Sequence, residues 1–184
     1  MDALTTERLR IEPLKLTHAQ ALLEYEIRNR AHLIRWEPLR DDTYYTLARA
    51  SKQVADHVAS AMAGRCARFL AFDDGPDVIS AINLWEIQRG VRHAAILGYS
   101  VDAAHEGKGY ATEAVEAVVR FAFERLNLHR IEASYQPENE RSARVLEKLG
   151  FAIEGRARGN LYLQGAWRDG ILVARVNDAW HPPL

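Results

Sequence analysis

Two glycines near the middle of the chain, Gly107 and Gly109, stand between a strand-like segment and a long amphipathic segment. Beyond them apolar residues recur at helical spacing, which predicts a helix starting near residue 110. Residues 129–136 then alternate apolar and polar side chains, as a strand does, and Pro137 ends the pattern. A strand, a helix and a second strand in this order predict a locally parallel crossover. The chain is therefore expected to have an α/β fold.

Other segments add strands and helices around this unit. Residues 8–13 alternate like a half-buried strand, Thr17 is a candidate N-cap for a first helix, and residues 43–62 predict a second helix that Gly64 ends. Residues 66–72, 78–87 and 92–101 predict strands in an antiparallel arrangement, and Asn139 is expected to cap a short helix. Further strands are expected over residues 151–155 and 169–176. With no internal repeat and no linker-like segment, residues 1–184 are expected to form a single domain.

Composition removes several classes of function. The chain has 24 basic and 25 acidic residues, so no global positive field favours a nucleic-acid partner. No apolar stretch approaches the ~20 residues that span a membrane, and the N-terminus does not resemble a signal peptide, so we expect a cytoplasmic protein. Cys66 is the only cysteine. His105 and Glu106 do not form a zinc-binding helix motif, because Gly109 stands where the second histidine belongs, so no metal site is expected.

Two segments combine residue types that are suited to chemistry. Gly107 and Gly109 expose backbone N–H groups at a helix start, where a diphosphate binds well, although a plain glycine turn explains the same pair. Asn139 and Ser142 bring an amide and a hydroxyl to the start of the later helix, although an ordinary N-cap and a first-turn serine explain them as well. Each segment alone leaves both interpretations open.

Taken together, at this separation and with a strand between them, the two segments resemble the GNAT superfamily of acyl-CoA-dependent N-acetyltransferases. In that family a Gln/Arg-x-x-Gly-x-Gly/Ala loop binds the coenzyme A pyrophosphate. Gly107 and Gly109 match this loop, whereas Ala104 replaces the usual Gln or Arg. Residues 6–14, 29–33, 36–38, 97–99, 130–133, 154–155 and 165–169 are similar to the RimJ/RimL type, which includes acetyltransferases of ribosomal-protein N-termini.

This resemblance spans nearly the whole chain and implies a GNAT fold. Such a fold is a mixed, mostly antiparallel sheet, flanked by helices, that splays between the strand ending at Val101 and the strand starting at His129. Acetyl-CoA, the implied cosubstrate, would fill the gap like an extra strand. The implied cofactor-binding residues are Tyr99, Ser100, Val101, His105, Glu106, Gly107, Lys108, Gly109, Tyr110, Ala111 and Asn139.

The resemblance also implies catalytic roles. Ser142 occupies the position of the acid that returns a proton to sulfur, by proton transfer or mainly by hydrogen bonding. Glu132 is a candidate general base, acting directly or through water, while a water chain with Glu132 as a structural carboxylate is the alternative. Ser134 and Leu161 stand near positions where relatives place a glutamate.

For the acceptor, Trp36, Glu37 and Arg40 lie in the segment that flanks the acceptor cleft in relatives, and Trp85 and Tyr135 are further candidates. Glu37 would attract an ammonium group and Trp36 would make a cation–π contact, although aromatic residues like these often belong to the core. The implied reaction is direct transfer of acetyl to the α-amino group of a protein, with a ribosomal protein as first guess. A small amine, such as a polyamine, an amino acid or an antibiotic, is the rival acceptor. A non-catalytic acyl-CoA-binding module is the alternative from another class, and a homodimer is compatible with the resemblance.

Overall fold

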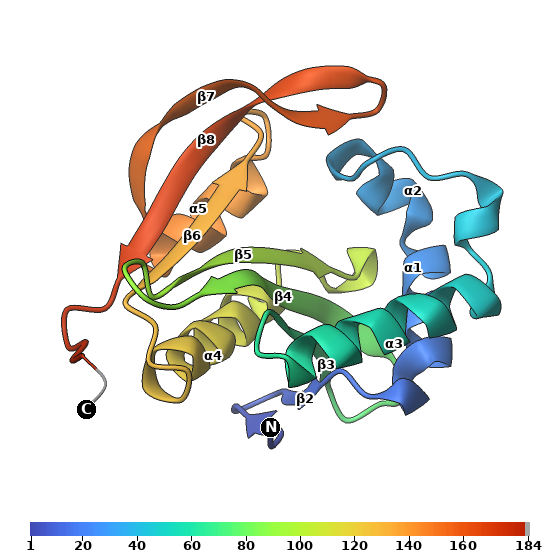
Figure 1. Ribbon diagram of the computed structural model, residues 1–184. Coiled ribbons are helices and arrows are strands. Elements are labelled where there is room, and N and C mark those ends of the chain that lie inside the picture. The colour runs from blue at the N-terminus through green and yellow to red at the C-terminus, as the bar shows by residue number, and fades with distance from the viewer. Residues whose placement is uncertain (183–184) are drawn as a thin grey trace.

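A twisted sheet runs through the computed structural model, which describes residues 1–182 (Figure 1). Within those residues it has eight strands in the order β1-β2-β3-β4-β5-β6-β8-β7. Neighbouring strands are antiparallel except β5 and β6, which are parallel as the sequence predicts. The strands are β1 (Leu4–Thr5), β2 (Arg10–Pro13), β3 (Ala67–Phe72), β4 (Val78–Gln88), β5 (Ala94–Val101), β6 (Arg130–Tyr135), β7 (Ala152–Leu163) and β8 (Ala166–Val176).

Helices cover both faces of the sheet. The helices α1 (Ala19–Arg28) and α3 (Leu47–Met62) pack on one face, where Leu22, Tyr25 and Val54 meet Leu70 of β3 in one buried cluster. On the opposite face, α4 (Tyr110–Glu124) and α5 (Glu140–Lys148) pack over the second and larger cluster. The short helix α2 (Arg30–Leu33) continues α1 and leads into the 3₁₀ turn η2 (Ile34–Trp36).

The two central strands separate shortly after they meet. β5 and β6 pair over only three positions, Ala94 with Arg130, Ala95 with Ile131 and Ile96 with Glu132. Beyond these, β5 continues beside β4 as far as Val101, while β6 continues beside β8. In Figure 1 the orange strands β6 and β8 turn away from the green strands β4 and β5. This divergence confirms the expected mixed, mostly antiparallel sheet that splays between these strands.

Several element boundaries differ from the prediction. Thr17 is not the N-cap of the first helix; it lies inside the 3₁₀ turn η1 (Leu16–His18), and α1 begins at Ala19. The helix expected from residue 43 begins at Leu47, because the Thr46 side chain accepts a hydrogen bond from the Arg49 N–H and caps it there. Residues 42–44 form a separate 3₁₀ turn, η3 (Asp42–Tyr44).

The last two strands are longer than predicted. β7 and β8 form a hairpin with register shifts between Ile153 and Gly155 and between Ala157 and Leu161. Each shift interrupts the alternation of apolar and polar residues, so the pattern that marks a strand fades near residue 155.

Within residues 1–182, no helix has the length and apolar character needed to cross a membrane. The same part of the chain contains no group of three or more His, Cys, Asp or Glu side chains arranged to hold a metal ion.

Candidate active site

Three adjoining cavities follow the divergence of β5 and β6. The loop cavity, about 220 Å³, lies at the start of α4 and includes Gly107 and Gly109 in its lining. The central cavity, about 440 Å³, shares Val101 and Arg141 with the loop cavity. The strand cavity, about 150 Å³, lies between β5 and β6 and is lined by Leu97, Gly98, Ala133 and Ser134 among others. The central and strand cavities share Tyr99 and Ser142, so the three cavities adjoin in a row that we call the trough.

The loop cavity has the backbone shape that the glycine pair predicts. Gly107 and Gly109 have φ values of +72° and +84°, in the left-handed region that other residues adopt only under strain. A Cβ atom on Gly107 would meet no atom within 4 Å, so the space beside it is open to a ligand. Gly109 is the N-cap of α4, whose first N–H groups lack partners within the helix and carry partial positive charge. The loop is therefore a site where an anion would bind.

Basic side chains of α5 form the opposite wall of the loop cavity. Arg141, Arg144 and Lys148 line it together, because spacings of three and four residues place them on one side of the helix. Glu106 contacts Arg141 across the cavity. Sequence reasoning does not select these three residues. The spacing of these three residues opposite the glycine loop was the signal that would have found this wall.

Asn139 and Ser142 both lie at the start of α5 and line the central and strand cavities. The Asn139 Oδ1 accepts a hydrogen bond from the Ser142 N–H at 3.1 Å, so Asn139 caps the helix. This leaves the amide NH₂ of Asn139 as the group that could donate to a ligand. The Ser142 Oγ lies 2.9 Å from the Tyr99 hydroxyl of β5.

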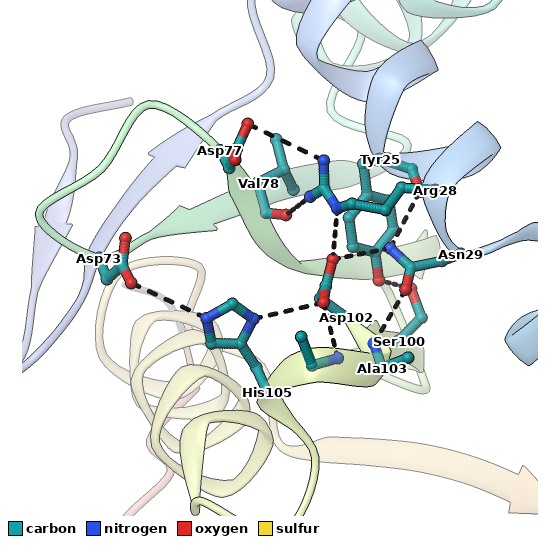
Figure 2. A network of polar contacts seen from close by, with 11 residues as sticks. Tyr25, Arg28, Asn29, Asp73, Asp77, Val78, Ser100, Asp102, Ala103 and His105 are labelled. Carbon is teal, nitrogen blue, oxygen red and sulfur yellow. Dashed lines mark hydrogen bonds and ion pairs between the residues drawn. The ribbon is translucent and has the colours of Figure 1, made fainter.

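A buried polar network holds the end of β5 and the turn before the glycine loop against α1 (Figure 2). The Asp102 carboxylate accepts hydrogen bonds from the Arg28 Nε at 2.7 Å, the Asn29 Nδ2 at 3.0 Å and the Ala104 N–H at 2.8 Å. Asn29 in turn accepts one from the Ala103 N–H. Burial by itself would raise the pKa of Asp102, but these hydrogen bonds outweigh it and lower the pKa to about 2. The turn that precedes Gly107 is thus fixed by a carboxylate that stays charged at neutral pH.

The same network reaches the strand residues expected to bind the coenzyme. The Ser100 Oγ lies 2.8 Å from the Tyr25 hydroxyl, and Ser80 donates to the Ser100 carbonyl. His105 lies beside Asp102, with 3.3 Å between its Nδ1 and the Asp102 Oδ1. His105 and Tyr110 line the loop cavity and pack edge to face.

On the acceptor side, Trp36 and Glu37 line the central cavity, and Tyr135 lines the strand cavity. Burial raises the pKa of the Glu37 carboxyl, while the positive charge of Arg40, 3.1 Å away, works in the opposite direction. The hairpin of β7 and β8 closes over this region, since the Gln164 Nε2 donates to the Glu37 carbonyl at 3.1 Å. Leu161 and Leu163 add apolar walls to the strand cavity.

Other expected site residues lie elsewhere. Among residues 1–182, the lining of the three cavities does not include Glu132, Trp85 or Lys108. Glu132 is held by Arg92 at 2.6 Å and Arg130 at 2.8 Å, in the closed part of the β5–β6 pair. The Lys108 carbonyl accepts a hydrogen bond from the Arg8 side chain.

Trp85 is half exposed and lines a different pocket, beside His57 and Cys66 on the α3 face. His32 and Arg35, which sequence reasoning did not select, line the central cavity instead. Both lie on the short helical segments after Asn29, where no periodic pattern singles out one face.

Comparisons with known proteins agree with this arrangement. The family profile described as "Acetyltransferase (GNAT) domain" matches residues 8–152. The chain is 39% identical over 168 residues to a probable N-acetyltransferase, YjcK, of Bacillus subtilis (strain 168), covering 91% of this chain and 93% of that protein. It is 35% identical over 180 residues to the [ribosomal protein uS5]-alanine N-acetyltransferase of Escherichia coli (strain K12), covering 97% and 93%. The crystal structure of ribosomal-protein-S5-alanine acetyltransferase from Vibrio fischeri superposes with a TM-score of 0.94 at 35% identity, covering 98% of this chain and 99% of that one.

Proposed function

Since the chain belongs to the GNAT family of acetyltransferases and to its RimJ/RimL type, we propose that it transfers the acetyl group of acetyl-CoA to the α-amino group at the N-terminus of a protein. A ribosomal protein is the first candidate acceptor. The names of the Escherichia coli and Vibrio fischeri relatives support an N-terminal alanine as the first residue to test. A solved Mycobacterium smegmatis RimJ, 30% identical with a TM-score of 0.88, is described as a complex with CoA-disulfide and supports the coenzyme.

One observation carries this proposal: a single trough joins an anion-binding loop to an acceptor wall and passes Ser142 on the way. The loop cavity fits a pyrophosphate, because it combines open glycine backbone, a helix N-terminus and basic side chains. The strand cavity is bordered by β5 and β6 where they no longer pair. Backbone N–H and C=O groups freed there are suited to hold an extended pantetheine arm.

In the proposed site the residues of the trough divide the work. The Gly107 and Gly109 backbone and the α4 start, which includes Ala111, hold the diphosphate, with Arg141 and Arg144 opposite. The Tyr99, Ser100 and Val101 backbone and the Asn139 amide orient the arm, while bound acetyl-CoA supplies the thioester.

Transfer forms a bond between the acceptor nitrogen and the acetyl carbon and breaks the carbon–sulfur bond. The attacking nitrogen must be neutral, so an acceptor that binds as an ammonium first releases one proton to solvent. In the transfer itself, one proton must leave the nitrogen and one must reach the sulfur. We assign the second task to the Ser142 hydroxyl, which donates a hydrogen bond or its proton to the departing sulfur. Glu132 is engaged by two arginines and lies outside the trough lining, so we assign removal of the first proton to water in the central cavity.

Glu37 and Trp36 are proposed to bind the acceptor ammonium. Both line the central cavity, where a carboxylate with reduced solvation attracts a cation strongly and an indole face adds a cation–π contact. Arg40 pairs with Glu37 and sets its orientation, and Tyr135 borders the same space from β6.

The test is acetyl transfer by the purified protein. The protein is incubated with acetyl-CoA and a panel of peptides that begin with Ala or Ser, together with the same peptides blocked at the N-terminus, free amino acids and spermidine. Thiol release gives the rate, and mass spectrometry locates the acetyl group. We expect acetylation only on the free α-amino group of peptides, fastest for N-terminal alanine.

Glu37→Gln should raise KM for the peptide about tenfold and leave KM for acetyl-CoA unchanged. Glu24→Gln, on the exposed side of α1, is the matched control and should change neither. Transfer to spermidine in preference to peptides would show that the acceptor is a small amine rather than a protein N-terminus. No transfer to any acceptor, despite tight acetyl-CoA binding, would favour a binding module over an enzyme.

A further inference from the structure

The Tyr99 side chain forms a specific pair with Ser142. Tyr99 extends from β5 and Ser142 from α5, so the contact crosses the trough between elements that are far apart in sequence. The Tyr99 hydroxyl lies 2.9 Å from the Ser142 Oγ and 3.3 Å from the Ser142 carbonyl oxygen. Both residues line the central and the strand cavity, which places the pair beside the proposed path of the reacting thioester.

The proton count of this pair allows two arrangements. The Tyr99 hydroxyl has one proton to donate, and the Ser142 hydroxyl has one. If Tyr99 donates to the Ser142 carbonyl, the serine proton is free to point at the Tyr99 oxygen. If Tyr99 donates to the Ser142 Oγ, the serine proton must point elsewhere, and the cavity that both residues line is available to it. The acceptor of the Tyr99 hydrogen bond therefore decides where the serine proton is directed.

Tyr99 remains a donor across the neutral range. Its ring packs against the larger buried cluster, and burial raises the pKa of its hydroxyl to about 12, against a smaller lowering by the hydrogen bond with Ser142. A phenol that stays protonated donates reliably. A donated hydrogen bond also polarises the accepting hydroxyl and makes that hydroxyl a stronger donor in turn.

We propose that Tyr99 is a positioning residue for acetyl transfer: by donating to the Ser142 Oγ it directs the serine proton into the cavity, toward the sulfur of the bound thioester. Tyr99 keeps its own proton throughout. The inference rests on the proposed function, since it assigns the sulfur as the partner of Ser142. It gives the Tyr99 side chain a role separate from the coenzyme contacts of its backbone.

A double-mutant cycle tests this coupling. Tyr99→Phe should lower kcat about tenfold while changing KM for acetyl-CoA less than twofold, because the phenyl ring still fills the space. Ser142→Ala should lower kcat by a larger factor. In the Ser142→Ala background, Tyr99→Phe should have no further effect, because no serine hydroxyl remains to be directed.

Tyr25→Phe is the matched control for the cycle. It also removes a buried tyrosine–serine hydrogen bond to β5, 2.8 Å long, but on the other face of the sheet. Whatever its effect on kcat, that effect should be the same with and without the Ser142 hydroxyl. If Tyr99→Phe lowers kcat equally in both backgrounds, or leaves kcat unchanged with Ser142 present, the positioning role is wrong.

A binding measurement separates this inference from the proposed function. We expect wild-type protein to bind CoA about threefold more tightly than desulfo-CoA, and both Tyr99→Phe and Ser142→Ala to abolish the difference, as measured by calorimetry. Absence of turnover with every acceptor would refute the proposed enzymatic function. The ratio of CoA affinity to desulfo-CoA affinity would still show whether Tyr99 directs the Ser142 hydroxyl toward sulfur. Equal ratios in the wild type and in Tyr99→Phe would overturn the coupling, whatever the activity.

Discussion

At the scale of single residues, Gly107 is the position where the backbone itself makes the site. Its left-handed φ is strained for most residues with a side chain, and the space where a Cβ atom would lie is open. Gly64, after α3, provides a close match, with a φ of +70° and equally open surroundings but outside the lining of the three cavities.

Gly107→Ala and Gly64→Ala should therefore lower the free energy of unfolding by a similar amount, roughly 1–2 kcal/mol, from the strain of a left-handed alanine. Only Gly107→Ala should weaken acetyl-CoA binding, by tenfold or more, because its methyl group enters the space proposed for the diphosphate. Denaturant melts give the first quantity and calorimetry the second. Equal acetyl-CoA affinity in the two variants would show that the diphosphate does not bind at this loop.

Residues whose role depends on the backbone were the easier ones to predict from sequence. Residue type and position are enough to predict the conformations of Gly107, Gly109 and the N-cap Asn139, and the structure has these conformations. The Tyr99–Ser142 contact could not be predicted, because it joins β5 to α5 and depends on how far the two strands separate. Trp85 was assigned to the acceptor side on residue type alone, and its strand position places it on the α3 face instead.

At the scale of elements, Asp102 fastens the end of β5 to α1. Its carboxylate is almost fully buried and joins Arg28 and Asn29 to the turn before the glycine loop. Its pKa falls from the ordinary 3.8 to about 2 in the folded protein, and this difference corresponds to about 2 kcal/mol of stability.

Because the folded pKa is the lower one, that contribution is complete above about pH 4 and is lost as the pH falls toward 2. Asp102→Asn should destabilise the protein by roughly 1–3 kcal/mol at pH 7 and flatten this acid limb of the stability profile. Asp77 is an exposed partner of the same arginine, with 3.8 Å between its Oδ1 and the Arg28 Nη1. Asp77→Asn should change neither the stability at pH 7 nor the acid limb. Denaturant melts between pH 2.5 and 7 measure both. An acid limb in Asp102→Asn as steep as that of the wild type would contradict this role.

Elements with a clean repeat were predicted correctly, and irregular ones were not. The helix α4 and the strand β6 have a regular apolar repeat and lie where the sequence indicates. The β7–β8 hairpin contains two register shifts, which hide its length, and the segment from α2 to η3 consists of turns too short for any repeat. Much of the acceptor wall comes from these irregular segments, so sequence reasoning describes that wall least well.

At the scale of the whole molecule, the two halves of the sheet are joined by only three pairs between β5 and β6. A ligand that fills the gap between them should act as a brace. At a hundred times its Kd, acetyl-CoA should stabilise the fold by about 2.7 kcal/mol, which is roughly 5–10 °C in Tm for a chain of this size.

Hydrogen exchange should show where this stabilisation acts. Added acetyl-CoA should slow exchange at residues 97–101 and 133–135, whereas amides where β2 pairs with β3 should change only as much as global stability requires. Gly107→Ala protein at the same acetyl-CoA concentration is the control and should show a smaller shift in Tm. Slowing spread evenly over all strands would place the ligand elsewhere.

The divergence of β5 and β6 has one more consequence, for handling the protein. An unpaired strand border inside a sheet is chemically the same as an outer border, a template for any extended chain that can reach it. Without coenzyme, the unpaired parts of β5 and β6 form such a template in the centre of the sheet, where an extended segment of another chain or of a second copy could pair. Storage with coenzyme bound would then protect the protein against aggregation as well as against thermal unfolding.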